Sequence, residues 1–203
     1  MTAIETRSDH LLPPPPSPRS QVGWWGMVLF CMNEAALFAC LIASYFYLGL
    51  NSRFWPPAGI EKPKLRMPLI MTALLLSSSF VLVYAERGFE KGQRIRYRIG
   101  TLITVLLGLG FLYVQLREYH DKLKTMHPTE HAYASIFYTI TGLHGTHVAF
   151  GLLVLLWALL RDLTGTTQPR YPLAIKNASL YWHFVDGVWL VILTSLYLSP
   201  RWY

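Results

Sequence analysis

The sequence predicts an all-α membrane protein, a polytopic bundle of five transmembrane helices. Hydrophobic residues make up 53% of its 203 residues and charged residues only 14%, against about 25% in average soluble domains. Five apolar runs divide the chain, and each is close to the ~20 residues that a helix needs to cross a bilayer. Together they use most of the chain, so we expect one helical domain and no second folded unit.

The five runs follow one another with short polar connections between them. They cover approximately residues 24–48, 67–84, 99–116, 132–160 and 178–198. Trp24 and Trp25 open the first run and suit the membrane interface, where indole rings are enriched. The third run contains Gly100, Gly108 and Gly110, which allow helices to approach one another closely.

The segment before the first run is rich in proline, with four consecutive prolines from Pro13 to Pro16. Consecutive prolines cannot form a helix. We therefore expect residues 1–22 to be a disordered segment and residues 23–203 to form the transmembrane domain. The segment lacks the early apolar core and the small-residue cleavage site of a signal peptide.

The net charge of +7 lies in the connecting segments, which indicates contact with lipid headgroups rather than with nucleic acid. The segment from Arg87 to Arg98 is short and strongly basic, and we expect Arg94, Arg96 and Arg98 in this connector to contact headgroups. With the N-terminus inside, ten of the 18 lysines and arginines lie in inner segments and eight in outer ones. This weak bias favours an inner N-terminus and an outer C-terminus.

Both cysteines, Cys31 and Cys40, lie in the first run. Nine helical residues separate them by about 13 Å, which is too far for a disulfide bond. We expect them to be buried small apolar side chains.

Polar residues inside the apolar runs are the candidate functional residues. His183 and Asp186 lie in the last run, three residues apart, so they share one face of a helix. A charged side chain at the centre of a bilayer costs about 2.5–3.5 kcal/mol on insertion scales. Such residues persist where they face protein, water or one another.

Three more polar residues lie at a comparable depth. Glu34 is about ten residues into the first run, or ~15 Å, and His144 and His147 are near the middle of the fourth. Because spans four and five run in opposite directions, we expect these residues to share one central layer with His183 and Asp186. A hydrogen-bonded network would remove much of the cost of burial, and its role is either structural or proton-linked.

Two interpretations of the buried histidines stay open. The simpler one is a hydrogen bond to a neighbouring helix. The alternative is ligation, in which His144 and His147 bind a metal or His144 and His183 supply both axial ligands of a haem. No Glu-x-x-His motif accompanies the histidines, although carboxylate-bridged di-iron bundles require one. Of the two, we predict the first, in which the chain's own histidines hold neither a metal ion nor a haem.

Four groups of residues, in order along the chain, carry a resemblance to a known family. They are Trp25-Gly26-Met27, Leu29-Phe30, Glu34, Leu37-Phe38 and Ser44-Tyr45 in the first run; Gln115, Glu118 and Tyr119 around the end of the third; Phe137-Tyr138, Thr141-Gly142 and His144-Gly145-Thr146-His147-Val148 in the fourth; and Tyr181-Trp182-His183-Phe184-Val185-Asp186 with Trp189 in the fifth. These residues resemble haem-copper oxidase subunit III. Longer members of that family have seven spans, so this chain resembles the five-helix version known among bacterial cytochrome c and quinol oxidases.

The resemblance implies a subunit of a terminal oxidase that reduces O2 to water and pumps protons across the bacterial cytoplasmic membrane, with its N-terminus inside. In the family, subunit III carries no redox centre, and the haem and copper belong to partner subunits I and II. It is expected to bind phospholipid and to support assembly, proton uptake and durability during turnover. The two helices that the five-helix version lacks can be supplied by another subunit.

Two other classes stay open. The family also includes subunit III-like proteins associated with nitric oxide reductases. An unrelated proton-linked transporter would use the central polar layer as its path, although the sequence shows no inverted repeat and no pair of broken helices.

Overall fold

The computed structural model describes residues 18–57, 65–165 and 171–199, and it confirms the all-α fold with five membrane-spanning helices. The elements are α1 (Pro18–Leu50), α2 (Arg66–Glu90), α3 (Arg94–Lys122), α4 (Ala132–Leu163), α5 (Tyr171–Ile192) and the π-helical segment η1 (Leu193–Leu198). Each of the five helices has a stretch that is long and apolar enough to cross a bilayer. The proline run lies outside the described residues.

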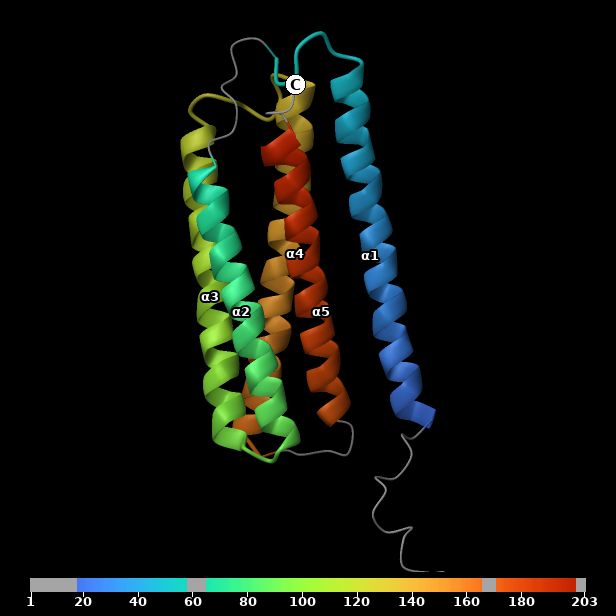
Figure 1. Cartoon of the computed structure of the whole chain (residues 1–203), viewed down its shortest axis with the longest axis vertical. Coiled ribbons are helices and arrows are strands. Elements are labelled where there is room, and N and C mark those ends of the chain that lie inside the picture. The colour runs from blue at the N-terminus through green and yellow to red at the C-terminus, as the bar shows by residue number, and fades with distance from the viewer. Residues whose placement is uncertain (1–17, 58–64, 166–170, 200–203) are drawn as a thin grey trace, which may run out of the picture.

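The helices run alternately in opposite directions, so their connections divide between two ends of the molecule (Figure 1). The start of α1, the turn between α2 and α3, and the start of α5 lie at one end, which we call the Gly92 end. The end of α1, the connection between α3 and α4, and η1 lie at the other, which we call the His127 end.

Helix α1 stands to one side of the other four helices (Figure 1). It packs on α4 and α5, and only 11% of its apolar stretch is buried, against 56% in the last helix. Phe38 and Tyr45 are the large side chains that it inserts into the core. Trp25, Leu29 and Tyr47 are exposed apolar side chains, as expected of a helix that faces hydrocarbon.

Both cysteines of α1 are free, in agreement with their helical spacing. Cys31 is buried as expected, whereas Cys40 is exposed, so that part of the prediction was wrong. The reason is that α1 contacts the bundle along one face only. Helical periodicity places Cys40 away from that face.

The helices extend beyond the apolar runs that predicted them, most clearly between Arg87 and Arg98. The sequence predicted a connector there, but α2 continues to Glu90 and α3 begins at Arg94. The turn centres on Gly92, whose φ of +73° is the left-handed conformation that glycine adopts readily. Hydropathy marks the part of a helix inside hydrocarbon, and it therefore missed the polar turns beyond.

Small residues bring α3 close to its neighbours, as the glycines of the third run predicted. A Cβ atom added to Gly100 would lie 2.6 Å from the Cβ of Ala85 on α2. At Gly108 it would lie 2.6 Å from a methyl carbon of Leu152 and 2.7 Å from the ring of Trp182. Glycine at these two positions sets the distance between the helices.

We expect Gly100→Ala to destabilise the protein by about 1–3 kcal/mol, the usual cost of overpacking a tight contact. The added methyl group would press on Ala85, which belongs to the adjacent helix and cannot rotate away. Gly110→Ala is the matched control, because its nearest neighbours are the methyl groups of Leu74 at 3.7 and 3.8 Å. Thermal unfolding in mild detergent measures both variants, and equal melting temperatures would contradict the prediction.

Tryptophan side chains fill the centre of the bundle and fix α5 against α2. Trp182 and Trp189 are fully buried, where an indole N–H requires a partner. The Trp182 N–H donates to Ser78 Oγ at 3.0 Å, and the Trp189 N–H donates to Thr72 Oγ1 at 2.9 Å. These two bonds set the register of the antiparallel pair.

Candidate functional site

Glu34 and His147 form a largely buried polar contact between α1 and α4. Glu34 Oε2 lies 3.0 Å from His147 Nε2, and the two side chains are only 17% and 14% exposed. Phe38 packs edge-on against the imidazole, with 5.2 Å between the ring centroids. Within the described residues, α1 has one other side-chain hydrogen bond to the bundle, from Asn177 to the Gly23 carbonyl at 3.2 Å.

The other ring nitrogen of His147 determines how many protons this contact holds. Nδ1 lies 2.8 Å from the carbonyl oxygen of Leu143. A carbonyl can only accept a hydrogen bond, so Nδ1 carries a proton. The bond between Nε2 and Glu34 then requires one further proton, located on either the carboxyl or the imidazole. The pair has no net charge in either case, which lowers its cost of burial.

His144 lies one turn of α4 from His147 but has different surroundings. It is fully buried, stacked on Trp189 at 5.3 Å and edge-on to Phe111 at 5.7 Å between centroids. Neither of its ring nitrogens has a hydrogen-bond partner among the described residues. The structure therefore places His144 in the packed aromatic core rather than in a polar chain.

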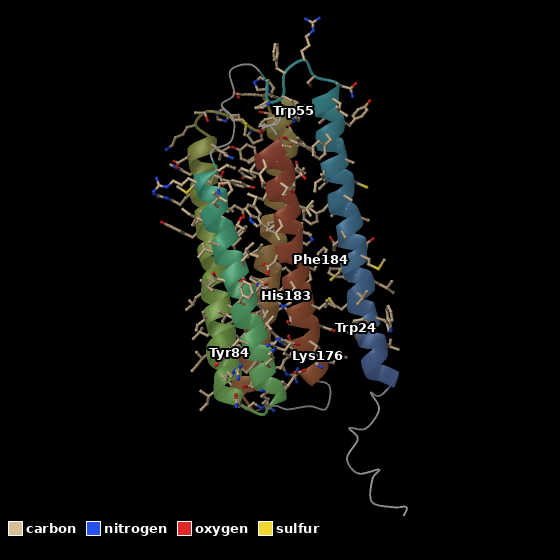
Figure 2. The ribbon with its side chains drawn as sticks, viewed as in Figure 1. Trp24, Trp55, Tyr84, Lys176, His183 and Phe184 are labelled. Atoms are coloured by element: carbon tan, nitrogen blue, oxygen red, sulfur yellow. The ribbon has the colours of Figure 1, made fainter. Side chains whose placement is uncertain are left out.

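His183 and Asp186 are joined through α2. The hydroxyl oxygen of Ser79 lies 2.8 Å from His183 Nδ1, and the hydroxyl donates to Asp186 Oδ2. Figure 2 shows His183 partway along the bundle, between α2 and α5. The single layer that we expected is thus divided, within the described residues, into this group and the Glu34–His147 pair. Position in a span indicates depth, but it does not indicate which neighbour a side chain faces.

Two of the three arginines predicted to contact lipid are paired with a buried carboxylate near the end of α4. The oxygens of Asp162 accept from Arg94 Nη1 at 2.5 Å and from Arg98 Nε at 2.6 Å. The arginine side chains remain 40% and 38% exposed, whereas Asp162 is 1% exposed. The sequence held one signal for this site, an acid directly after the apolar run, which our prediction did not use.

Arg96 has a different environment. Its guanidinium lies 3.5 Å from the ring centre of Tyr84, and its Nε donates to the Tyr84 carbonyl at 3.1 Å. It has no carboxylate partner in the described part of the chain. It lines a groove of about 1100 Å³ between α2 and α3. Half of the other ten groove residues are large apolar side chains, namely Phe80, Val81, Ile95, Ile99 and Ile103, and Arg94 also lines the groove.

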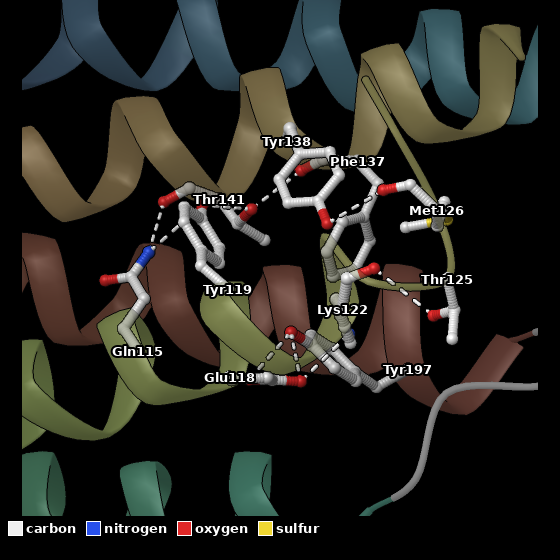
Figure 3. Close-up of polar contacts among 10 residues, drawn as sticks. All are labelled: Gln115, Glu118, Tyr119, Lys122, Thr125, Met126, Phe137, Tyr138, Thr141 and Tyr197. Carbon is white, nitrogen blue, oxygen red and sulfur yellow. Dashed lines mark hydrogen bonds and ion pairs between the residues drawn. The ribbon is translucent and has the colours of Figure 1, made fainter. Parts of the chain in front are cut away.

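A second buried ion pair lies near the His127 end, where α3, α4 and η1 meet (Figure 3). Lys122 Nζ lies 2.8 Å from Glu118 Oε1, one helical turn away. The ammonium also lies over the rings of Phe137 and Tyr197, at 4.0 and 4.9 Å, where a cation is attracted to the ring faces. The Tyr197 hydroxyl points at the same carboxylate, 3.4 Å away. This cluster anchors η1 to α3.

The neighbouring turn of α3 is bonded to α4 (Figure 3). Gln115 Nε2 donates to the Thr141 carbonyl at 2.7 Å, and the Tyr119 hydroxyl bonds to Thr141 Oγ1 at 2.6 Å. A Cβ atom at Gly145 would lie 2.9 Å from Gln115 Oε1, so a glycine there leaves space for the amide. The motif residues of α3 and α4 thus meet in one helix contact.

The arrangement as a whole offers protonatable groups at helix contacts. No group of three or more His, Cys, Asp or Glu side chains in the described residues is placed to hold a metal ion. His144 and His183, considered above as haem ligands, face different partners: the first is enclosed by aromatic rings, and the second contacts Ser79. The hydrogen bonds and ion pairs of Glu34, Asp186 and Asp162 tie the helices together.

Five membrane-spanning helices with buried carboxyl groups at their contacts define a polytopic α-helical membrane protein. Residues 20–201 match the family model described as cytochrome c oxidase subunit III. Cytochrome c oxidase subunit 3 of Bacillus sp. (strain PS3) is 39% identical over 180 residues, which cover 87% of this chain and 84% of the relative. The same subunit of Petromyzon marinus is 36% identical over 190 residues, which cover 89% and 71%.

The chain therefore belongs to the cytochrome c oxidase subunit III family, as the resemblance of its motifs predicted. It is a multi-pass membrane subunit of a haem-copper terminal oxidase, an oxidoreductase complex with other subunits. A further relative, the subunit 3 of Drosophila melanogaster, is 34% identical over 179 residues, which cover 85% of this chain and 68% of the relative.

Proposed function

We propose that this chain is a non-catalytic subunit III that supports assembly, proton uptake and durability of a proton-pumping oxidase in the bacterial cytoplasmic membrane. In this proposal the haem and copper belong to subunits I and II. The observation that carries it is the Glu34–His147 contact, a neutral proton-sharing pair near the middle of α1. Such a pair can both hold a helix and release or accept a proton.

The weak packing of α1 explains why one polar contact would matter for durability. Apolar side chains gain little from helix association within lipid, because the acyl chains are equally apolar. With 11% of its apolar stretch buried, α1 depends more than the other helices on its few polar contacts. Loss of the Glu34–His147 bond would let α1 separate from α4 and α5 and disturb whatever subunit packs beside it.

The composition and working lifetime of the purified complex test this function. We expect the chain to co-purify with a large multi-span haem protein. A complex without the chain should begin at a near-normal rate of oxygen consumption and lose activity after fewer turnovers. An unchanged lifetime would contradict the supporting role, and stoichiometric haem in the isolated chain would contradict the non-catalytic one.

We expect the Gly92 end to be cytoplasmic, because the charge bias and the family resemblance agree on an inner N-terminus. In a variant that lacks Cys31 and Cys40, an impermeant thiol reagent should label Thr125→Cys in intact cells. Lys91→Cys should react only after the membrane is opened. Both positions are exposed. Lys91 lies at the Gly92 end, and Thr125 lies at the His127 end. The reverse labelling pattern would show the opposite orientation.

We also propose that the groove between α2 and α3 holds one anionic phospholipid, with its phosphate at Arg96 and an acyl chain along the apolar lining. The support is charge complementarity. Arg94 and Arg98 share the carboxylate of Asp162, whereas Arg96 has no acidic partner among the described residues. A basic side chain near the membrane surface attracts an anionic headgroup by about 1 kcal/mol.

Arg96→Ala should remove one tightly bound anionic lipid from the purified complex, counted by native mass spectrometry. Arg117→Ala is the control, because Arg117 is an exposed arginine of the same helix, α3, but lies towards its other end. The control should retain the full complement of lipid. Equal lipid counts in the two variants would contradict the proposed site.

A further inference from the structure

A row of protonatable side chains leads from the Gly92 end into the membrane between α2 and α5. At its outermost step, Lys176 Nζ lies 3.2 Å from Glu90 Oε1. About one helical turn further in, the Ser179 hydroxyl donates to Glu86 Oε2 at 2.9 Å. The row ends at the Ser79 group described above. We call this set the α2–α5 ladder: Lys176 with Glu90, Ser179 with Glu86, and Ser79 with His183 and Asp186.

Helical geometry explains why these residues form a row. On α5, the ladder residues are spaced by three or four positions, which keeps them on one face. The α2 members face them in reverse order because the two helices are antiparallel. From Lys176 to Asp186, α5 rises about 15 Å, or half of the ~30 Å hydrocarbon layer.

The exposure of the titratable side chains decreases along the ladder. Lys176 and Glu90 are 55% and 53% exposed, Glu86 and His183 are half-buried, and Asp186 is buried. Asp186 Oδ1 has no hydrogen-bond partner among the described residues. A buried carboxyl oxygen without a partner calls for an explanation. A proton carried on that oxygen, or a water bonded to it, would supply one.

The position of Ser79 allows a proton to pass between His183 and Asp186. Its hydroxyl can accept from His183 Nδ1–H while it donates to Asp186 Oδ2. When a proton leaves a charged His183 for Ser79 Oγ, the hydroxyl proton of Ser79 moves to Asp186. The serine is again a neutral hydroxyl, the histidine becomes neutral, and the carboxylate becomes a carboxylic acid. Charge and protons balance, and no side chain has to move.

The titratable groups that face this end of the ladder belong to the ladder itself. Glu86 accepts a hydrogen bond from Ser179, which lies about one turn of α5 from His183 on the surface side. Glu34 and His147 are bonded to one another between α1 and α4. In the described part of the chain, no acid or base of α1, α3 or α4 forms a hydrogen bond or an ion pair with a ladder residue.

We propose that the α2–α5 ladder is a proton inlet, which carries protons between the surface at the Gly92 end and Asp186. The ligand is the proton, taken from water at Glu90 and Glu86 and stored on the buried carboxyl of Asp186. This proposal is separate from the role assigned to Glu34 and His147, since the two groups share no hydrogen bond among the described residues.

Infrared spectroscopy of the intact complex tests the inlet directly. A titration in H2O should reveal a carboxylic acid C=O band that Asp186→Asn removes. On rapid exchange into D2O, the time course of the shift of this band reports how fast protons reach Asp186. Should Asp186→Asn fail to assemble, Asp186→Glu would identify the band by shifting it.

Two ladder variants and two controls test whether the exchange rate at Asp186 depends on the ladder residues. Ser79→Ala removes the relay hydroxyl and should slow exchange at Asp186 by about tenfold or more, as expected for loss of a positioned proton carrier. Glu86→Gln should slow it to a smaller extent. Thr72→Ala, which breaks the α2–α5 bond to Trp189, and Glu118→Gln, a buried carboxyl outside the ladder, should leave the rate unchanged.

Each result distinguishes conduction from packing. Slowed exchange in the two ladder variants, with both controls unchanged, supports the inlet. Unchanged exchange in Ser79→Ala overturns it. An equal slowing in Thr72→Ala also overturns it, because helix packing rather than the relay would then set the rate. The absence of any band that depends on Asp186 shows that Asp186 stores no proton, and this too refutes the proposal.

Discussion

Glu34→Ala is expected to weaken the attachment of α1 and to shorten the working life of the oxidase. The change leaves His147 Nε2 without its partner in a largely buried position, at a cost of about 1–3 kcal/mol. We expect less of the chain to remain in the purified complex, and activity to be lost over fewer turnovers. His147→Ala should act similarly. The double variant should cost less than the sum of the single ones, because both remove the same bond.

Glu34→Gln separates the structural and the proton-linked parts of this role. A glutamine amide can donate to His147 Nε2, so the bond persists while the ionisable group is lost. Assembly should therefore be normal, whereas the dependence of oxygen consumption on pH should change. Normal assembly and durability in Glu34→Ala would contradict the structural role. An identical pH profile in Glu34→Gln would contradict the proton-linked one.

Asp162→Ala is expected to have the largest effect on the stability of the Gly92 end. It removes the shared partner of Arg94 and Arg98 and leaves two cations side by side. Loss of one partner from a fully buried pair costs ~3–5 kcal/mol, and we expect about 3 kcal/mol here, because the arginines are partly hydrated. Thermal unfolding in detergent provides the measurement.

Asp121→Ala is the control for this prediction. Asp121 also lies beside a basic residue, Lys124 at 3.3 Å, but both side chains are exposed. Water replaces such a contact with little loss, so its melting temperature should match that of the parent. If Asp162→Ala unfolds at the same temperature as Asp121→Ala, the carboxylate does not hold α3 against α4.

Hydropathy predicted the five helices because the bilayer imposes a length and a composition on every span. It located their ends less well. Residues 87–98 are basic, so the sequence indicated a connector there, although only a turn at Gly92 separates α2 from α3. Outside hydrocarbon a helix can continue through polar residues, and its end then depends on local bonds and on a glycine rather than on polarity.

The polar residues show even more clearly which features the sequence predicts and which it does not. Helical rise alone placed Glu34, His147, His183 and Asp186 at similar depths. It could not say that Glu34 faces His147 while Asp186 faces Ser79. Each of these bonds joins residues more than one hundred positions apart, so the partner depends on how the helices are arranged.

By itself, the sequence determined the class of this protein, the number of its spans and, through its motifs, its family. Those properties follow from composition, periodicity and residue order. Only the tertiary structure decided that α1 stands apart, that Asp162 forms ion pairs with both Arg94 and Arg98, and that Ser79 completes a row of protonatable groups. The physical reason is that depth is a property of one helix, whereas the neighbour that a side chain meets is set by the rotation and packing of two.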